Sequence, residues 1–100
     1  MRLTGEEIAA IRDAAEQAFG GGLIGLRLFG SRVDDSRRGG DIDLHVEVAD
    51  ATDARDREEA FHRLLWRALG DRRIDVAVHR QGAPLRGIDR VAHEKGVRLL

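Results

Sequence analysis

Two aspartates at the start of an apolar strand are the side chains of this sequence best suited to chemistry. Asp41 and Asp43 stand in the segment Asp-Ile-Asp-Leu, which begins ten residues after Ser31. Side chains alternate across a strand, so the two carboxylates project from the same face, roughly 7 Å apart along it. Oxygen ligands this close suit hard divalent cations such as Mg²⁺. The pair therefore predicts a metal site, and the structural alternative is that both residues only begin a strand after Gly39-Gly40.

A glycine-serine turn precedes these aspartates. The apolar run that ends at Phe29 leads directly into Gly30-Ser31, and Arg32 follows. Glycine lets backbone amides approach an anion, the serine hydroxyl adds a donor, and a guanidinium suits phosphate oxygens. The turn and the aspartates together predict one site for a metal and a phosphate chain, as in phosphoryl or nucleotidyl transfer. An ordinary turn residue is the alternative interpretation of Ser31.

A third carboxylate lies on a later strand. Residues 73–78 alternate between apolar side chains on one face and Asp75 on the other, and the strand that contains Asp43 alternates in the same way. If the two strands pair, Asp75 joins Asp41 and Asp43 on the open face of the sheet. Three carboxylates can bridge two metal ions about 3.5–4 Å apart. A solvent-facing strand position is the alternative for Asp75.

The glycine-serine pair, the gap and the Asp-x-Asp pattern of Asp41 and Asp43 resemble the signature of the polymerase-beta-like nucleotidyltransferases. The short length resembles the minimal nucleotidyltransferases (MNT), which often act as antitoxins beside a HEPN-domain partner. The resemblance extends over nearly the whole chain. It implies that Asp41, Asp43 and Asp75 are catalytic and bind two Mg²⁺ ions, and that Asp75 helps to deprotonate the incoming hydroxyl.

The same resemblance implies the substrates. Gly30, Ser31 and Arg32 would hold the phosphates of ATP or another nucleoside triphosphate, and a nucleoside monophosphate, AMP in the case of ATP, would pass to a hydroxyl. The chain is too short to contain a substrate domain, so a HEPN-type toxin would present the acceptor tyrosine, and the chain would act as an antitoxin by AMPylation.

Two alternatives to this enzyme remain open. One is an MNT-like antitoxin that neutralises its partner by contact alone, motivated by the acidic segment Val33-Asp34-Asp35 where many relatives carry Arg-Gly. The other is a metal- or nucleotide-binding subunit of a larger transferase whose second domain lies on a separate chain.

Composition limits the class of protein. One hundred residues, 42% of them apolar, make a single domain over residues 1–100. The chain has no cysteine, which excludes disulfides and thiolate zinc sites. A formal net charge of −1 argues against nucleic acid as a direct partner. No apolar stretch approaches membrane-spanning length and the N-terminus lacks a signal-peptide pattern, so we expect a cytoplasmic protein without membrane contact.

The elements that must position these residues follow from periodicity and capping signals. Thr4 and Glu7 form a predicted capping box, and the spacing predicts helices over residues 5–18 and 54–69, the second stopped by Gly70. Alternation predicts strands at about 23–29, 42–48, 73–79 and 97–100. This order predicts an α/β (α+β) nucleotidyltransferase domain with a mixed sheet of about four strands, helices on one face and the acidic metal site on the other.

A last helix should begin near Pro84 and end at Gly96, with Leu85, Ile88, Val91 and Ala92 buried. His45 and His79 share strand faces with the acids and are expected to line the cleft or face a partner rather than bind metal. His62 and His93 are expected on the surface. Trp66 lies one step off an apolar helix stripe, which favours a core rim or a partner contact.

Overall fold

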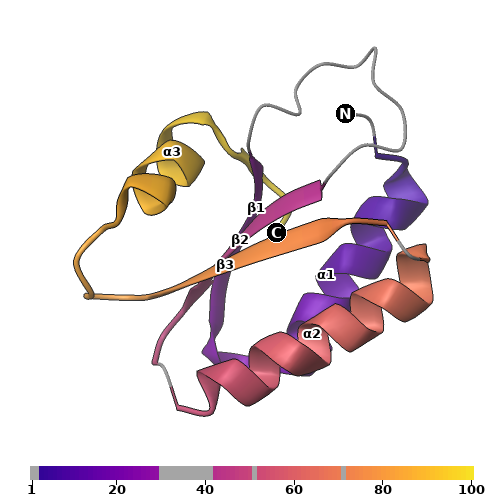
Figure 1. Cartoon of the computed structure of the whole chain (residues 1–100), viewed down its shortest axis with the longest axis horizontal. Helices are drawn as coiled ribbons and strands as arrows, with labels where there is room; N and C mark the ends of the chain where they lie inside the picture. The colour runs from indigo at the N-terminus through magenta and orange to yellow at the C-terminus, as the bar shows by residue number, and fades with distance from the viewer. Residues whose placement is uncertain (1–2, 30–41, 51, 71) are drawn as a thin grey trace.

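The computed structural model describes residues 3–29, 42–50, 52–70 and 72–100. Within them the chain forms a small α+β domain, and the predicted order of elements is confirmed (Figure 1). The elements are α1 (Gly5–Phe19), the 3₁₀ turn η1 (Gly20–Gly22), β1 (Leu23–Phe29), β2 (Ile42–Val48), α2 (Ala54–Leu69), β3 (Ile74–Arg80), α3 (Gly87–Lys95) and β4 (Val97–Arg98). In these residues, no helix is both long enough and apolar enough to cross a membrane.

The four strands form one mixed sheet in the order β3-β2-β1-β4. β1 pairs with β2 and β4 in antiparallel register, whereas β2 and β3 are parallel. A parallel pair needs a crossover connection, and α2 supplies it. The predicted mixed sheet of four strands is therefore confirmed, with β2 at its centre and β3 at one edge.

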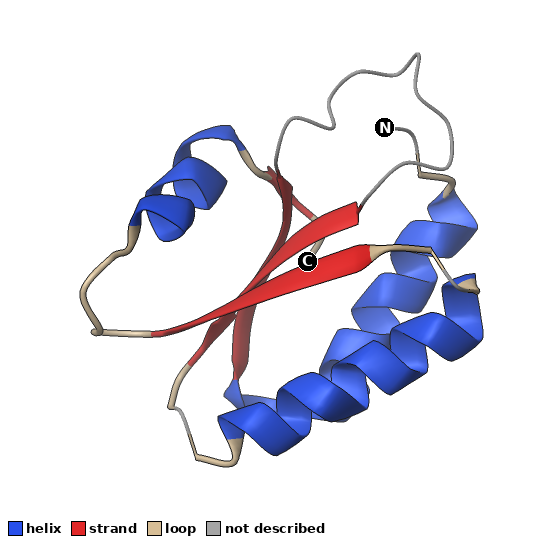
Figure 2. Cartoon of the chain, viewed as in Figure 1, coloured by secondary structure: helices blue, strands red, loops and turns tan. Residues whose placement is uncertain are grey.

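The hydrophobic core lies between one face of this sheet and the two long helices, α1 and α2 (Figure 2). Alternation along β2 sends Ile42, Leu44, Val46 and Val48 into this core. The two helices meet through the rings of Phe19 and Phe61, which pack edge to face with centroids 5.5 Å apart. The opposite face of β2 carries Asp43, His45 and Glu47.

Capping residues fix the helix ends as predicted. The Thr4 hydroxyl accepts a hydrogen bond from the Glu7 backbone amide at 3.0 Å, and the Glu7 carboxylate accepts one from the Thr4 amide at 2.9 Å. Gly70 ends α2 with a φ of 83°, a conformation that favours glycine.

The last helix differs from its prediction. It begins at Gly87 rather than near Pro84, and Leu85, Ile88 and Val91 are each more than 40% exposed instead of buried. Of the four predicted core positions only Ala92 is buried. The helix also lies on the face of the sheet opposite to α1 and α2 (Figure 1). On that face it meets a polar side chain, His45 of β2. Its apolar stripe therefore faces outward and its polar side faces the sheet.

Candidate functional site

Asp43 and Asp75 lie side by side on adjacent strands. In the parallel register of β2 and β3, Asp43 is paired directly with Asp75. Paired residues of neighbouring strands are about 4.8 Å apart and point to the same face of the sheet. Here that face is the one turned away from α1 and α2. Asp43 is half-buried and Asp75 is exposed, so solvent reaches the pair at Asp75.

The two carboxylates share a cleft. Its lining combines the two acids with apolar residues from three elements: Phe29, Asp43, Asp75, Val76, Ala77 and Ile88. The predicted pairing of the two strands is thus confirmed and brings two of the three predicted acids together. Asp41, Gly30, Ser31 and Arg32 lie outside the described residues, and their proposed roles stay predictions.

Two neighbouring carboxylates can act together on a cation. Negative charges this close repel each other, and a bound divalent ion relieves that repulsion. Oxygen-only ligands favour a hard ion such as Mg²⁺ that completes its coordination with water or phosphate oxygens. The donor set of Asp43 and Asp75 therefore fits the predicted Mg²⁺.

A second group of polar side chains lies under α3, and the sequence did not predict it. His45 is fully buried, and its Nε2 lies 2.8 Å from Oδ1 of the equally buried Asp89. Asp89 also accepts hydrogen bonds from the backbone amide, Nε and Nη2 of Arg86 at 2.7–3.0 Å. These bonds hold the pKa of Asp89 well below its usual range although burial opposes the shift, and the bond to His45 lowers it further. Asp89 is therefore a carboxylate.

Glu47 is held from the other side by His79. The Nδ1 of His79 lies 2.9 Å from Oε2 of Glu47, and its Nε2 lies 3.0 Å from the carbonyl oxygen of Ala83. Both neighbours are acceptors, so the ring donates two protons when both bonds form. Burial lowers the pKa of His79, but these two bonds and the charges of Glu47 and Asp89 outweigh it, and the pKa is raised.

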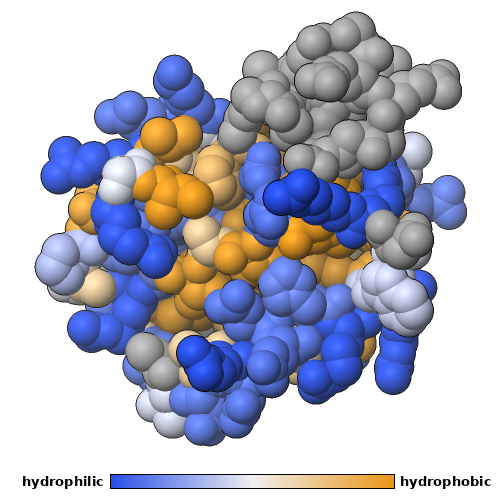
Figure 3. Space-filling view, viewed as in Figure 1, coloured by the Kyte–Doolittle hydropathy of each residue, from blue (hydrophilic) through white to orange (hydrophobic). Residues whose placement is uncertain are grey.

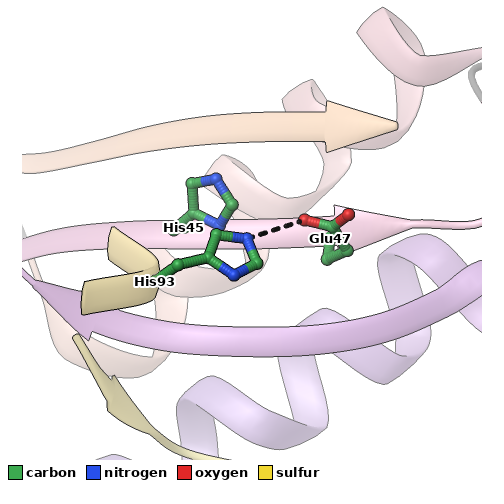
Figure 4. Close-up of side chains that lie close together, drawn as sticks. All are labelled: His45, Glu47 and His93. Carbon is green, nitrogen blue, oxygen red and sulfur yellow. Dashed lines mark ion pairs between the residues drawn. The ribbon is translucent and has the colours of Figure 1, made fainter. Parts of the chain in front are cut away.

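His93 of α3 completes the group. Its Nε2 lies 3.6 Å from Oε1 of Glu47, and its ring lies edge-on to that of His45 with centroids 5.6 Å apart. Figure 4 shows His45, Glu47 and His93 converging from β2 and α3. One ligand atom from each of the three lies within 4.8 Å of the other two, an arrangement that could hold a metal ion.

The expectations for the histidines were therefore only partly right. His45 does not line the acidic cleft or face a partner, because α3 covers it. His93 is 38% exposed, yet it faces Glu47 rather than solvent alone. Strand alternation did place His45 and Glu47 on the face of Asp43, but no sequence signal brought α3 to that face.

The exposed Trp66 of α2 forms another surface feature. Its side chain is 62% exposed, which excludes the core-rim interpretation. It lines a groove together with neighbours from α2 and the start of β3: His62, Arg63, Arg67, Arg72 and Ile74. Contact of Trp66 with a partner stays a prediction.

No protein-family model matches the chain, and no curated protein matches it.

Proposed function

We propose that this chain is a minimal nucleotidyltransferase that moves a nucleoside monophosphate, AMP from ATP, to a hydroxyl of a partner protein. The observation that carries the proposal is the direct pairing of Asp43 with Asp75 on parallel strands, on the face of the sheet turned away from α1 and α2. The sequence supports the same reaction, because Gly30-Ser31 precedes the Asp41-x-Asp43 pattern and would bind the phosphates.

The residues have distinct tasks in this reaction. The acceptor oxygen attacks the α-phosphorus, the bond from that phosphorus to the pyrophosphate oxygen breaks, and the hydroxyl proton passes to a carboxylate. Asp75, the more exposed acid, would take that proton. Asp43 and Asp75 would hold Mg²⁺, which when bound neutralises phosphate charge. Positioning and electrostatics supply most of the rate enhancement in such transfers.

Exposed apolar side chains beside the cleft support a protein as the acceptor. Ile88 lines the cleft and is 43% exposed, and Val91 lies one helical turn further along α3 with 42% exposed. Figure 3 shows apolar surface over α3 among hydrophilic side chains. Such a patch favours contact with another protein, and a HEPN-type helical toxin is the partner that we propose.

The test is a transfer assay read by intact-mass spectrometry. The chain is incubated with ATP, Mg²⁺ and the product of the neighbouring open reading frame, as the proposed HEPN-type partner, which should gain mass in steps of one adenylate. Asp75→Asn should abolish this gain, because it removes a metal ligand and proton acceptor without changing the side-chain size. Asp13→Asn, on the exposed face of α1, is the matched control and should transfer normally. Equal transfer by Asp75→Asn would refute the proposed role of the acid pair.

A second candidate is an antitoxin that neutralises its partner by contact alone. The exposed indole of Trp66 favours it, because tryptophan is enriched at the centres of protein interfaces. In this case the chain and its partner form a stable complex, no mass is added, and Asp75→Asn still neutralises. Trp66→Ala should then weaken the complex.

A further inference from the structure

Helix α3 packs on the sheet with little apolar burial. The helix has nine residues, and isolated helices of this length are marginal in water. Apolar burial contributes little, since Ile88 and Val91 face outward and Ala92 is the helix's buried apolar residue. The contacts to the sheet are instead polar, through Asp89 to His45 and His93 toward Glu47.

Two buried polar atoms among the side chains between α3 and the sheet lack a hydrogen-bond partner. They are Nδ1 of His45 and Oε1 of Glu47, the only such side-chain atoms among the residues that the structure describes. A buried polar atom without a partner is unfavourable, and a bound ion or an ordered water is one explanation for such an atom. His45 and Glu47 also belong, with His93, to a group of side chains within the described ranges in which one ligand atom from each lies within 4.8 Å of the others.

The hydrogen bonds around His45 prepare its free nitrogen as a ligand. Both oxygens of Asp89 already accept hydrogen bonds from Arg86, so Asp89 acts as an acceptor toward His45 as well, and Nε2 of His45 is the donating nitrogen. In the neutral ring Nδ1 then carries the lone pair. A histidine that donates one ring N–H to a carboxylate and offers its other nitrogen is the usual arrangement around protein-bound metals.

We propose that His45 Nδ1, Glu47 Oε1 and His93 Nε2 bind a divalent transition-metal ion of the Zn²⁺ type that fastens α3 to β2. Two imidazoles and one carboxylate are a ligand set for Zn²⁺ and its neighbours, not for Mg²⁺. His79 orients the Glu47 carboxylate from its Oε2 side and leaves Oε1 toward the ion. A water completes the coordination on the side where His93 reaches solvent.

The distances are compatible with closure around an ion. Ligand atoms of tetrahedral Zn²⁺ lie about 3.3 Å apart, given bonds of about 2.0–2.1 Å. His93 Nε2 and Glu47 Oε1 are already 3.6 Å apart. The His93 side chain is 38% exposed, so it has room to adjust toward an ion.

This site is separate from the proposed Mg²⁺ site and does not depend on the proposed function. It uses the same strand, but the Phe29 ring packs edge-on against His45 with centroids 6.3 Å apart, and Phe29 also lines the acidic cleft. The proposed Zn²⁺-type ion and the proposed Mg²⁺ therefore have different ligands on one face of the sheet.

The first test is calorimetric titration of the full chain, stripped by chelator, with Zn²⁺. We expect one ion per chain and at least about tenfold weaker binding by His93→Ala, which removes one ligand. His62→Ala is the matched control, because His62 is a similarly exposed helical histidine beside Glu58, away from α3. Unchanged affinity in His93→Ala, absence of binding, or loss of binding in His62→Ala would each overturn the proposal. Asp75→Asn should bind Zn²⁺ normally, which distinguishes this site from the proposed active site.

A second readout guards against a merely structural effect of the substitution. Long-range ¹H–¹⁵N spectra of the histidine rings should show a Zn²⁺-dependent shift of His45 Nδ1, while Nε2 stays protonated. Co²⁺ should give the strong visible absorption of low-coordinate sites, and this absorption should be lost in Glu47→Gln. If the His45 ring resonances do not respond to Zn²⁺, the assigned ligand is wrong.

Discussion

Asp89 is the residue whose removal tests most directly how α3 is held. Its carboxylate is fully buried and accepts hydrogen bonds from two directions: His45 Nε2 at 2.8 Å, and the Arg86 backbone amide at 2.7 Å. The second bond caps the first turn of α3. In Asp89→Ala both donors lose their acceptor, and the His45 donor stays buried.

The expected cost follows from these two bonds. A helix cap contributes about 1 kcal/mol, and a buried donor left without a partner costs roughly 1–3 kcal/mol. The Arg86 guanidinium adds little, because its side chain is 57% exposed and can turn to water. We therefore expect Asp89→Ala to lower the free energy of unfolding by about 3 kcal/mol, the sum of the lost cap and the buried donor left without a partner.

Urea unfolding followed by far-ultraviolet circular dichroism measures this loss. Hydrogen exchange should locate it, with protection lost in the amides of α3 and kept in α1. Asp13→Ala is the control: Asp13 is exposed on α1, and its removal should change the free energy of unfolding by less than about 0.5 kcal/mol. A loss below about 1 kcal/mol in Asp89→Ala would refute this account of how α3 is attached.

Two further predictions concern pH and backbone packing. Because the pKa of His79 is raised, its protonated form contributes stability that is fully present below pH 6.5 and is lost as the pH rises through the raised value. The urea midpoint should therefore fall on raising the pH above 6.5, and His79→Gln should flatten that fall by removing the charged bond to Glu47. Gly96→Ala should destabilise the chain, because the new β-carbon would clash with the backbone oxygen of Ala92, whereas the β-carbon of Gly87→Ala would meet nothing within 4 Å. Thermal unfolding of the two alanine variants should show a lower midpoint for Gly96→Ala alone; equal midpoints would contradict the close approach.

The sequence determined the elements whose signals are local. The bounds of β1, β2 and α2 match the predicted ranges, because alternation, helical periodicity and the stop at Gly70 all act over a few residues. The capping box of Thr4 and Glu7 is likewise a contact between residues three apart. The face of each acid was also predictable, since alternation assigns Asp43 and Asp75 to the polar side of their strands.

The tertiary structure decided which polar residues meet. The register that sets Asp43 beside Asp75 joins residues 32 positions apart, and no local pattern specifies it. The orientation of α3 was mispredicted, because apolar periodicity finds the core-facing side only when the surface that receives the helix is apolar. Here the receiving strand face carries His45, so Asp89 turned inward and Ile88 outward. Burial of Asp89 and of two histidines depends on that long-range docking, which is why only the folded chain shows the group under α3.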